Sequence, residues 1–240
     1  MRTLKIGIPI VVAQILLISM QFVDTVMAGH VSAKDLAALA IATALFHPLV
    51  LLLVGILMSV TPMVAQLKGS RKDDKISRLV ADAFQLSLVF AVPTIFMLHL
   101  LKPLMEAIGY PAEVSRIGDG YLHAVSWGLP ALLAYDVFRH FNEGLAITRP
   151  NMYFHILGLM LNILGNYTLM FGNFGFPAMG AVGAGWSTAM AWNLMLIMMF
   201  TFSFKNRRLR IYLEIRDFFQ IRFQNTREIL RIGIPNGFST

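Results

Sequence analysis

Long apolar runs separated by short polar segments dominate the sequence, and this pattern predicts helices that span a membrane. A helix needs about 20 residues to cross a hydrocarbon core of about 30 Å. The predicted complete spans are residues 6–28, 36–67, 77–101, 115–140, 151–172 and 181–204. The second run is the longest, so we expect it to tilt or to extend beyond the membrane. Pro48 and Pro62 lie within it, and each removes a backbone donor and can bend the helix.

A hydrophilic stretch at residues 205–226 follows the sixth span, and a short repeat follows the stretch. Leu230-Arg231-Ile232-Gly233-Ile234-Pro235 repeats Leu4-Lys5-Ile6-Gly7-Ile8-Pro9 at an offset of 226 residues. Many transporters are built from such repeats. We therefore expect an N-terminal six-helix transmembrane lobe at 1–204, a cytoplasmic inter-lobe linker at 205–226 and the truncated start of a second lobe at 227–240. Doubling the offset gives a whole protein of about 450 residues.

Composition supports an all-α polytopic membrane protein. The 240 residues are 57% hydrophobic with a mean hydropathy of +0.66, and 14% are charged, against about 25% in a soluble domain. The chain has no cysteine, which excludes a disulfide framework and a thiolate metal site. The first apolar run is too long for a signal-peptide core and has no small-residue cleavage site after it, so we expect no cleavable signal.

The distribution of Lys and Arg predicts the orientation. With the N-terminus in the cytoplasm, seventeen of the 20 basic residues fall inside, and only Lys34, Lys102 and Arg116 fall outside. This is the positive-inside bias of multi-pass membrane proteins. The basic cluster from Lys205 to Arg210 lacks interleaved aromatic residues, so we interpret it as a topology signal that contacts anionic lipid rather than nucleic acid.

Asp24 is an ionisable residue inside the first span. A carboxylate there costs at least about 2.5 kcal/mol, so such a residue normally faces a bundle interior or a water-filled cavity. Gln14 and Gln21 lie within the same helical stripe of about 80°. The pattern favours a cation or proton site, with a fixed hydrogen bond between helices as the alternative.

Three more polar residues are predicted at the depth of Asp24. Asn162 and Asn166 lie four positions apart on one face of span five, and Thr188 lies in the outer third of span six. Carboxylate, amide and hydroxyl oxygens are the ligands that hard cations such as Na⁺ prefer, and they also suit a protonatable Asp. Alternatively, the two Asn residues only bridge helices, a role worth about 0.6 kcal/mol per bond.

Charged residues also gather at the inner ends of spans three and four. Asp136 is spaced to pair with Arg139 and with His140, and Glu143 lies one turn further on. Together with Asp82 and Gln85 of span three, these residues predict an inner-face charge network, with a gating role as the alternative. No metal-binding, nucleophile-elbow or phosphate-loop motif occurs.

Several short motifs are distributed along the chain from about residue 4 to its end. They are Pro9, Gln14, Phe22-Val23-Asp24-Thr25-Val26-Met27-Ala28-Gly29, Thr61-Pro62-Met63-Val64-Ala65-Gln66, Glu143-Gly144-Leu145-Ala146 with Thr148-Arg149-Pro150, Asn162 with Asn166, and Gly180-Ala181-Val182-Gly183-Ala184-Gly185. The glycine-rich run also predicts close helix packing at the start of span six. In combination these motifs resemble the multidrug and toxic compound extrusion (MATE) family, in its bacterial NorM-like branch.

The resemblance implies a fold and a function. Members have twelve spans in two six-span lobes, and the match covers the first lobe and the start of the second. It implies a secondary active antiporter, not an enzyme, in a bacterial inner membrane with a cytoplasmic N-terminus. Such a protein exports organic cations or drugs in exchange for Na⁺ or H⁺. The expected partners are those substrates, membrane lipid and the missing C-terminal lobe, with no nucleic acid and no cofactor besides the coupling ion.

The resemblance also implies site residues. The cation or proton site would comprise Asp24, Asn162, Asn166 and Thr188, with Na⁺ held at the first three. Some relatives carry a second Asp at the position of Asn166, so this chain would have one titrating group there. The supporting or gating residues would be Pro9, Gln14, Gln21, Asp136, Arg139 and Glu143.

Three alternatives remain at this level. A flippase for lipid-linked substrates would need a strongly cationic cavity, and we expect no buried Lys or Arg in the spans. An intramembrane enzyme would need paired carboxylates or several His residues at one depth. A truncated fragment without transport activity is also compatible with the resemblance.

Overall fold

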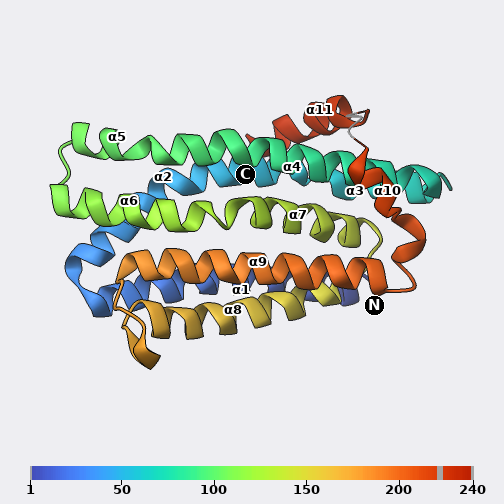
Figure 1. Ribbon diagram of the computed structural model, residues 1–240. Helices are drawn as coiled ribbons and strands as arrows, with labels where there is room; N and C mark the ends of the chain where they lie inside the picture. Colours follow the sequence, from blue (N-terminus) through green and yellow to red (C-terminus); the bar gives the residue numbers. More distant parts are fainter. Residues whose placement is uncertain (1, 221–223, 239–240) are drawn as a thin grey trace.

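The computed structural model describes residues 2–220 and 224–238, with side chains from residue 7 onward. Arg222 and Thr240, which entered the charge count and the limits of the predicted second lobe, lie outside these residues. The described part is a bundle of long helices that run side by side (Figure 1). Its α-helices are α1 (Arg2–Val31), α2 (Ala33–Leu57), α3 (Val60–Gly69), α4 (Ile76–His99), α5 (Leu101–Ala107), α6 (Ala112–Ser126), α7 (Leu129–Gly144), α8 (Arg149–Leu169), α9 (Ala181–Lys205), α10 (Ile215–Phe219) and α11 (Thr226–Gly237). Three 3₁₀ turns are η1 (Asp73–Lys75), η2 (Asn173–Gly175) and η3 (Arg210–Tyr212).

Two of the predicted spans are each divided into two helices. The 36–67 run breaks at Met58 and Ser59 into α2 and α3, and the 115–140 run breaks at Trp127 and Gly128 into α6 and α7. Pro62 and Pro130 lie in the first turns of α3 and α7, just after the breaks. Proline is tolerated there because the backbone N–H groups of a first turn have no intrahelical acceptor. Pro48 lies inside α2 and does not end it.

Four segments of the described chain are long and apolar enough to cross a membrane. They are Gly7–Val31, Ala33–Gly69, Asp73–Ala107 and Ala181–Lys205. The other two predicted spans coincide with α6–α7 and with α8, which lie lengthwise in the same bundle (Figure 1). The polar residues on their inner faces include Asp136, Asn151, Asn162 and Asn166, all buried. Buried polar groups on them pair with neighbouring helices instead of facing lipid.

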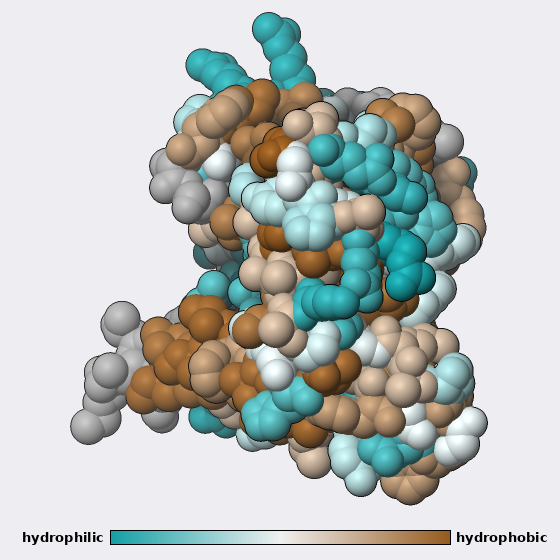
Figure 2. All heavy atoms as spheres, turned by 90° about the vertical axis from the view of Figure 1, so that its left-hand side faces the viewer, coloured by the Kyte–Doolittle hydropathy of each residue, from teal (hydrophilic) through white to brown (hydrophobic). Residues whose placement is uncertain are grey.

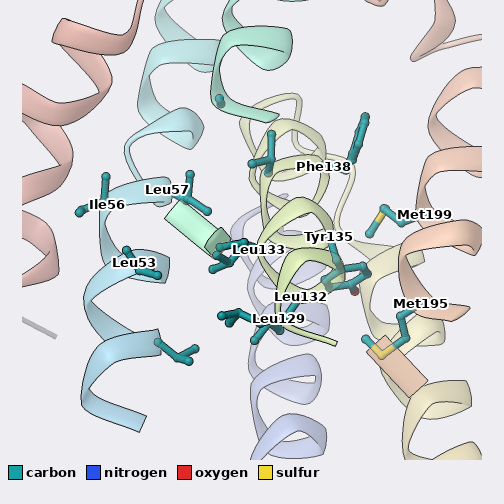
Figure 3. Packing of buried hydrophobic residues seen from close by; sticks show 14 of the residues in the cluster. Leu53, Ile56, Leu57, Leu129, Leu132, Leu133, Tyr135, Phe138, Met195 and Met199 are labelled. Atoms are coloured by element: carbon teal, nitrogen blue, oxygen red, sulfur yellow. The ribbon is translucent and has the colours of Figure 1, made fainter. Parts of the chain in front are cut away.

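The core lies where α2, α7 and α9 meet. Figure 3 shows Leu57 of α2 and Leu133 of α7 pointing toward each other, with Met195 and Met199 of α9 on the far side of α7. Phe138 of α7 is fully buried and contacts aromatic rings from three other helices. Because α7 is covered on all sides, it fixes the spacing of the helices around it.

The glycine-rich start of α9 packs closely against two neighbours, as predicted. A Cβ on Gly183 would lie 2.6 Å from the Leu169 carbonyl oxygen of α8, and one on Gly185 would lie 2.8 Å from the Tyr121 carbonyl oxygen of α6. Only glycine allows backbones to approach this closely. The start of α9 is therefore wedged between α6 and α8.

The hydrophilic stretch after α9 folds back onto the bundle through η3 and α10. The Phe218 ring stacks on Phe138, with centroids 5.9 Å apart. Gln85 Nε2 donates to the Phe218 and Gln220 carbonyls, and Asp82 Oδ2 accepts from the Asn225 backbone and side-chain N–H groups at 2.8 Å each. Our assignment of Asp82 and Gln85 to an inner-face charge network is therefore wrong. They are buried because they satisfy the backbone of this stretch, whose role as an inter-lobe linker stays a prediction.

Candidate functional site: a buried carboxylate between three helices

Asp24 of α1 is buried against α8 and α9, with 5% of the residue exposed. Its Oδ1 accepts a hydrogen bond from Asn166 Nδ2 at 2.6 Å, and its Oδ2 accepts one from Thr188 Oγ1 at 3.1 Å. These partners lie 142 and 164 residues away in the sequence. The side chain therefore joins α1 to α8 and α9.

Asn162 completes the cluster one turn below Asn166 on α8. Its Nδ2 donates to Thr188 Oγ1 at 3.1 Å, and its Oδ1 lies 3.4 Å from Asn166 Nδ2. Neither Asn residue has any exposed surface. The structure thus brings together all four residues that the sequence predicted for the site, and it does so through direct contacts.

The donors of the cluster converge on Asp24. Thr188 has one hydroxyl proton, which it directs to the carboxylate while it accepts from Asn162. An ionised carboxylate only accepts hydrogen bonds, so this arrangement suits a charged Asp24. No salt bridge among the described residues involves Asp24. Its charge is solvated by dipoles and not neutralised.

Asn166 Oδ1 is the remaining oxygen of the cluster. It is buried without a hydrogen-bond partner in the part of the chain that the structure describes. An unsatisfied buried acceptor costs about 1–3 kcal/mol. With Asp24, Asn162 and Thr188 it brings carboxylate, amide and hydroxyl oxygens to one place, a donor set that fits a hard cation. A cation beside Asp24 would give the Asn166 oxygen a partner if the amide turned.

The sequence did not reveal Ser187 as a member of the site. Its hydroxyl donates to the Asn162 backbone carbonyl at 2.9 Å. Gly165 makes room for it, because a Cβ there would lie 3.0 Å from the Ser187 Cβ. A Ser beside Thr188 after the glycine-rich run was the available signal, but only packing shows that it reaches α8.

Three residues predicted to support the site lie outside it. Gln14 is exposed and makes no hydrogen bond with the described residues, and Gln21 is exposed and contacts His47 Nε2 on α2. Pro9 is buried within α1, four turns from Asp24. The stripe of about 80° that holds Gln14, Gln21 and Asp24 spans the boundary between the buried and exposed faces of α1. Residues close in angle around the helix therefore have different neighbours.

A second buried polar cluster lies in the C-terminal half of α7, away from Asp24. Asp136 Oδ1 accepts from Arg139 Nε at 2.7 Å, which confirms that predicted pair. His140 Nδ1 lies 3.4 Å from Glu143 Oε2 and 3.0 Å from the Thr61 hydroxyl, so His140 contacts these two and not Asp136 as predicted. The side chain of Arg139 is 14% exposed, which corrects the expectation that the spans hold no buried Lys or Arg. Its charge is balanced by Asp136 because both lie on one helix face.

Asn151 of α8 ties this cluster to a neighbouring helix. Its Nδ2 donates to Glu143 Oε1 at 3.2 Å, while its backbone carbonyl lies 2.8 Å from His155 Nδ1. The cluster therefore links α3, α7 and α8 through side-chain contacts.

The chain is similar to known proteins over most of its length. A model of the MatE family matches residues 9–168. The multidrug resistance protein NorM of Photobacterium profundum is 42% identical over 209 residues, which cover 87% of this chain and 46% of that relative. The multidrug resistance protein MdtK of Pectobacterium atrosepticum is 36% identical over 231 residues, which cover 96% of this chain and 50% of that relative. The chain spans about half the length of the curated relatives it matches.

Solved structures match over the same extent. A eukaryotic MATE transporter has a TM-score of 0.87 at 16% identity, covering 98% of this chain and 52% of that one. A multidrug resistance MATE family transporter in an outward-facing conformation has a TM-score of 0.86 at 20% identity, covering 99% and 52%. At these identities the matches show the fold, and they confirm the predicted fold class of one helical lobe.

Proposed function

The chain belongs to the MatE family, and on that premise we propose that it forms the N-terminal lobe of a multidrug exporter. The exporter exchanges organic cations or drugs for Na⁺ or H⁺. The observation that carries this proposal is the carboxylate of Asp24 on α1, buried against α8 and α9 with no cationic partner among the described residues. A buried charge that lacks a fixed counter-ion has a reason to bind an exchangeable one.

Asp24 holds the coupling ion, and its neighbours respond to it. When Asp24 is ionised, Asn166 and Thr188 donate to its two oxygens. When Na⁺ or a proton neutralises Asp24, the carboxylate no longer needs both donors. The buried Asn166 Oδ1 then gains by turning toward the cation or the carboxylic proton. Ion binding thereby changes the hydrogen bonds that hold α1 against α8 and α9.

The described part of the chain supports a placement with the N-terminus in the cytoplasm of a bacterial inner membrane. Residues 68–78 and 205–216, which carry ten of the 20 basic residues, lie at one end of the bundle, where Lys68 contacts Tyr212. At the other end, Lys34 pairs with Glu113. A concentration of positive charge at one end favours the cytoplasmic side.

Transport requires a second lobe that faces the polar surface of α1 and α2. Gln14, Gln21 and Thr25 are exposed on α1, and Gln21 contacts His47 of α2. Polar side chains on a spanning helix are costly against lipid, so this surface faces water or another polar surface. In two-repeat transporters that surface lines a cleft between lobes. We therefore expect residues 1–240 alone to insert in a membrane and not to transport.

The proposal is tested with Asp24→Asn in the protein produced from its complete gene. Ethidium efflux from proteoliposomes is measured under an imposed Na⁺ gradient and, separately, under a pH gradient. We expect the mutant to be inserted at normal levels and to lose gradient-driven efflux. Asp74→Asn, an exposed carboxylate in η1, is the matched control and retains efflux. Normal coupled efflux by Asp24→Asn would overturn the assignment of the site.

A further inference from the structure

One carboxylate joins the starts of two helices at the end of the bundle where α1 meets α2. The Asp35 backbone N–H donates to the Ser32 hydroxyl at 3.0 Å, and that hydroxyl donates to Asp35 Oδ2 at 2.5 Å. Ser32 is the N-cap of α2, so the two side chains close its first turn. Figure 2 views the molecule from this end, where hydrophilic side chains form a band across the middle.

The other oxygen of Asp35 serves α9, the last long helix of the bundle. Asp35 Oδ1 accepts from the backbone N–H of Ala181 at 2.7 Å, across 146 residues of sequence. Gly180 precedes Ala181 with φ +57°, and a Cβ there would lie 3.0 Å from the Asp35 carboxyl carbon. A negative charge at a helix start is favourable, because unpaired N–H groups point outward there. Asp35 therefore caps α2 and α9 at once.

Asp24 and Thr188 lie equally far along their helices from the end of the bundle where Asp35 binds Ala181. Asp24 lies seven positions before Val31, where α1 ends, and Thr188 lies seven positions after Ala181. At 1.5 Å per residue, each is roughly 10.5 Å along its helix. The side chains of α1 and α9 meet where Thr188 Oγ1 contacts Asp24 Oδ2 at 3.1 Å.

The third helix of the site is tied at the same end. The Met179 N–H donates to the Leu169 carbonyl at 2.8 Å, and the Gly180 N–H donates to the Met170 carbonyl at 3.2 Å. Asn166 lies three positions before Leu169. The start of α9 is thus held to the end of α8 by the backbone of the loop and to the start of α2 by Asp35, so both ties set the position of Thr188 relative to Asp24.

We propose that Asp35 is a positioning residue for the cation site. It holds α9 in the axial register that places the Thr188 hydroxyl against Asp24, and so it sets the affinity of the site for the coupling cation. A change of register that carries the Thr188 hydroxyl roughly 0.5 Å further from Asp24 along the 3.1 Å bond would stretch it to a length at which it is no longer a hydrogen bond. The inference rests on the proposed function, since it gives Asp35 a role in the same site.

Two substitutions separate the length of the Asp35 side chain from its charge. Asp35→Glu keeps the charge and adds one methylene, about 1.5 Å. Asp35→Asn removes the charge and keeps the length and one oxygen that can accept from Ala181. If register matters, Asp35→Glu raises the cation concentration for half-maximal ethidium efflux about tenfold, with the maximal rate per inserted molecule within about twofold. Asp35→Asn stays within about threefold of the wild type.

The measurement is gradient-driven ethidium efflux from proteoliposomes, titrated with NaCl at fixed pH and with pH at fixed NaCl. A role confined to stabilising the fold predicts fewer folded molecules with an unchanged half-maximal concentration, and that result would overturn the inference. An Asp35→Asn shift as large as that of Asp35→Glu would also overturn it, because charge and not length would then matter.

Hydrogen exchange at the first amides of α9 gives an independent reading of the cap. We expect faster exchange at residues 181–184 in Asp35→Glu than in the wild type, also in an Asp24→Asn background. Wild-type ethidium efflux that depends on neither the Na⁺ gradient nor the pH gradient would refute the proposed function and this inference together. A wild type that responds to a gradient, with unshifted titrations in Asp35→Glu, would refute the inference alone.

Discussion

Asp24 and Asp136 are buried to the same extent, each 5% exposed, but they have different neighbours. Asp136 lies 2.7 Å from the guanidinium of Arg139, so its charge is neutralised within one helix. Asp24 receives hydrogen bonds from an amide and a hydroxyl on two other helices. Burial alone therefore does not separate a structural carboxylate from one that can exchange a cation. The pairing separates them, because a permanent counter-ion competes with an exchangeable one.

The largest effect is expected when the paired carboxylate, Asp136, loses its partner. Arg139→Met leaves Asp136 buried without its partner. We expect a loss of about 3–5 kcal/mol in the free energy of unfolding, since an uncompensated buried charge remains. The midpoint of thermal unfolding in detergent should fall by roughly 6–20 °C. An unchanged midpoint would mean that Asp136 does not depend on Arg139.

Removing one donor from the unpaired carboxylate should have a smaller effect on stability and a specific effect on function. Thr188→Val deprives Asp24 of a donor and Asn162 of an acceptor, at a cost of about 1–3 kcal/mol. We also expect weaker dependence of ethidium efflux on the coupling cation. Thr188→Ser keeps the hydroxyl and should behave as the wild type. Equal behaviour of the Val and Ser variants in both assays would exclude the hydroxyl from the site.

Replacing both members of the ion pair tests whether Asp136 has only a structural role. Asp136→Leu with Arg139→Met removes both charges together. Because a buried pair is often no more stable than apolar residues of similar volume, we expect unfolding within about 1 kcal/mol of the wild type. Thermal unfolding of the single and double variants measures the coupling. A double variant as unstable as Arg139→Met alone would show that the pair also serves another contact.

The smallest effect is expected on the exposed part of α1. Gln14→Leu replaces a side chain that makes no hydrogen bond with the described residues, so unfolding should change by about 0.5 kcal/mol or less. Thermal unfolding of the same preparations checks this. A large loss of stability would place Gln14 in a contact that residues 2–220 and 224–238 do not show. Gln14 serves as a same-helix control for Asp24.

The candidate site was predictable because its members follow local rules. Asn162 and Asn166 share a helix face through their spacing, and the apolar runs placed Asp24 and Thr188 at one depth. The same rules failed for Asp82 and Gln85. Both lie at the predicted end of α4, but they bind Phe218, Gln220 and Asn225 of the stretch after α9. A residue's depth follows from its position in a run, whereas its partner depends on how its helix is turned.

The sequence by itself determined the helices, their apolar lengths, the uneven distribution of basic residues and the depth of the polar groups. These features depend on neighbours within one or two turns, so periodicity and hydropathy suffice to predict them. The tertiary structure decided which side chains meet. It turned Asp24 toward α8 and α9 and left Gln21 on the other side of the same stripe, and it brought Asp35 to the start of α9. Contacts across 140 residues or more depend on the rotation and register of whole helices, which packing of the entire bundle fixes.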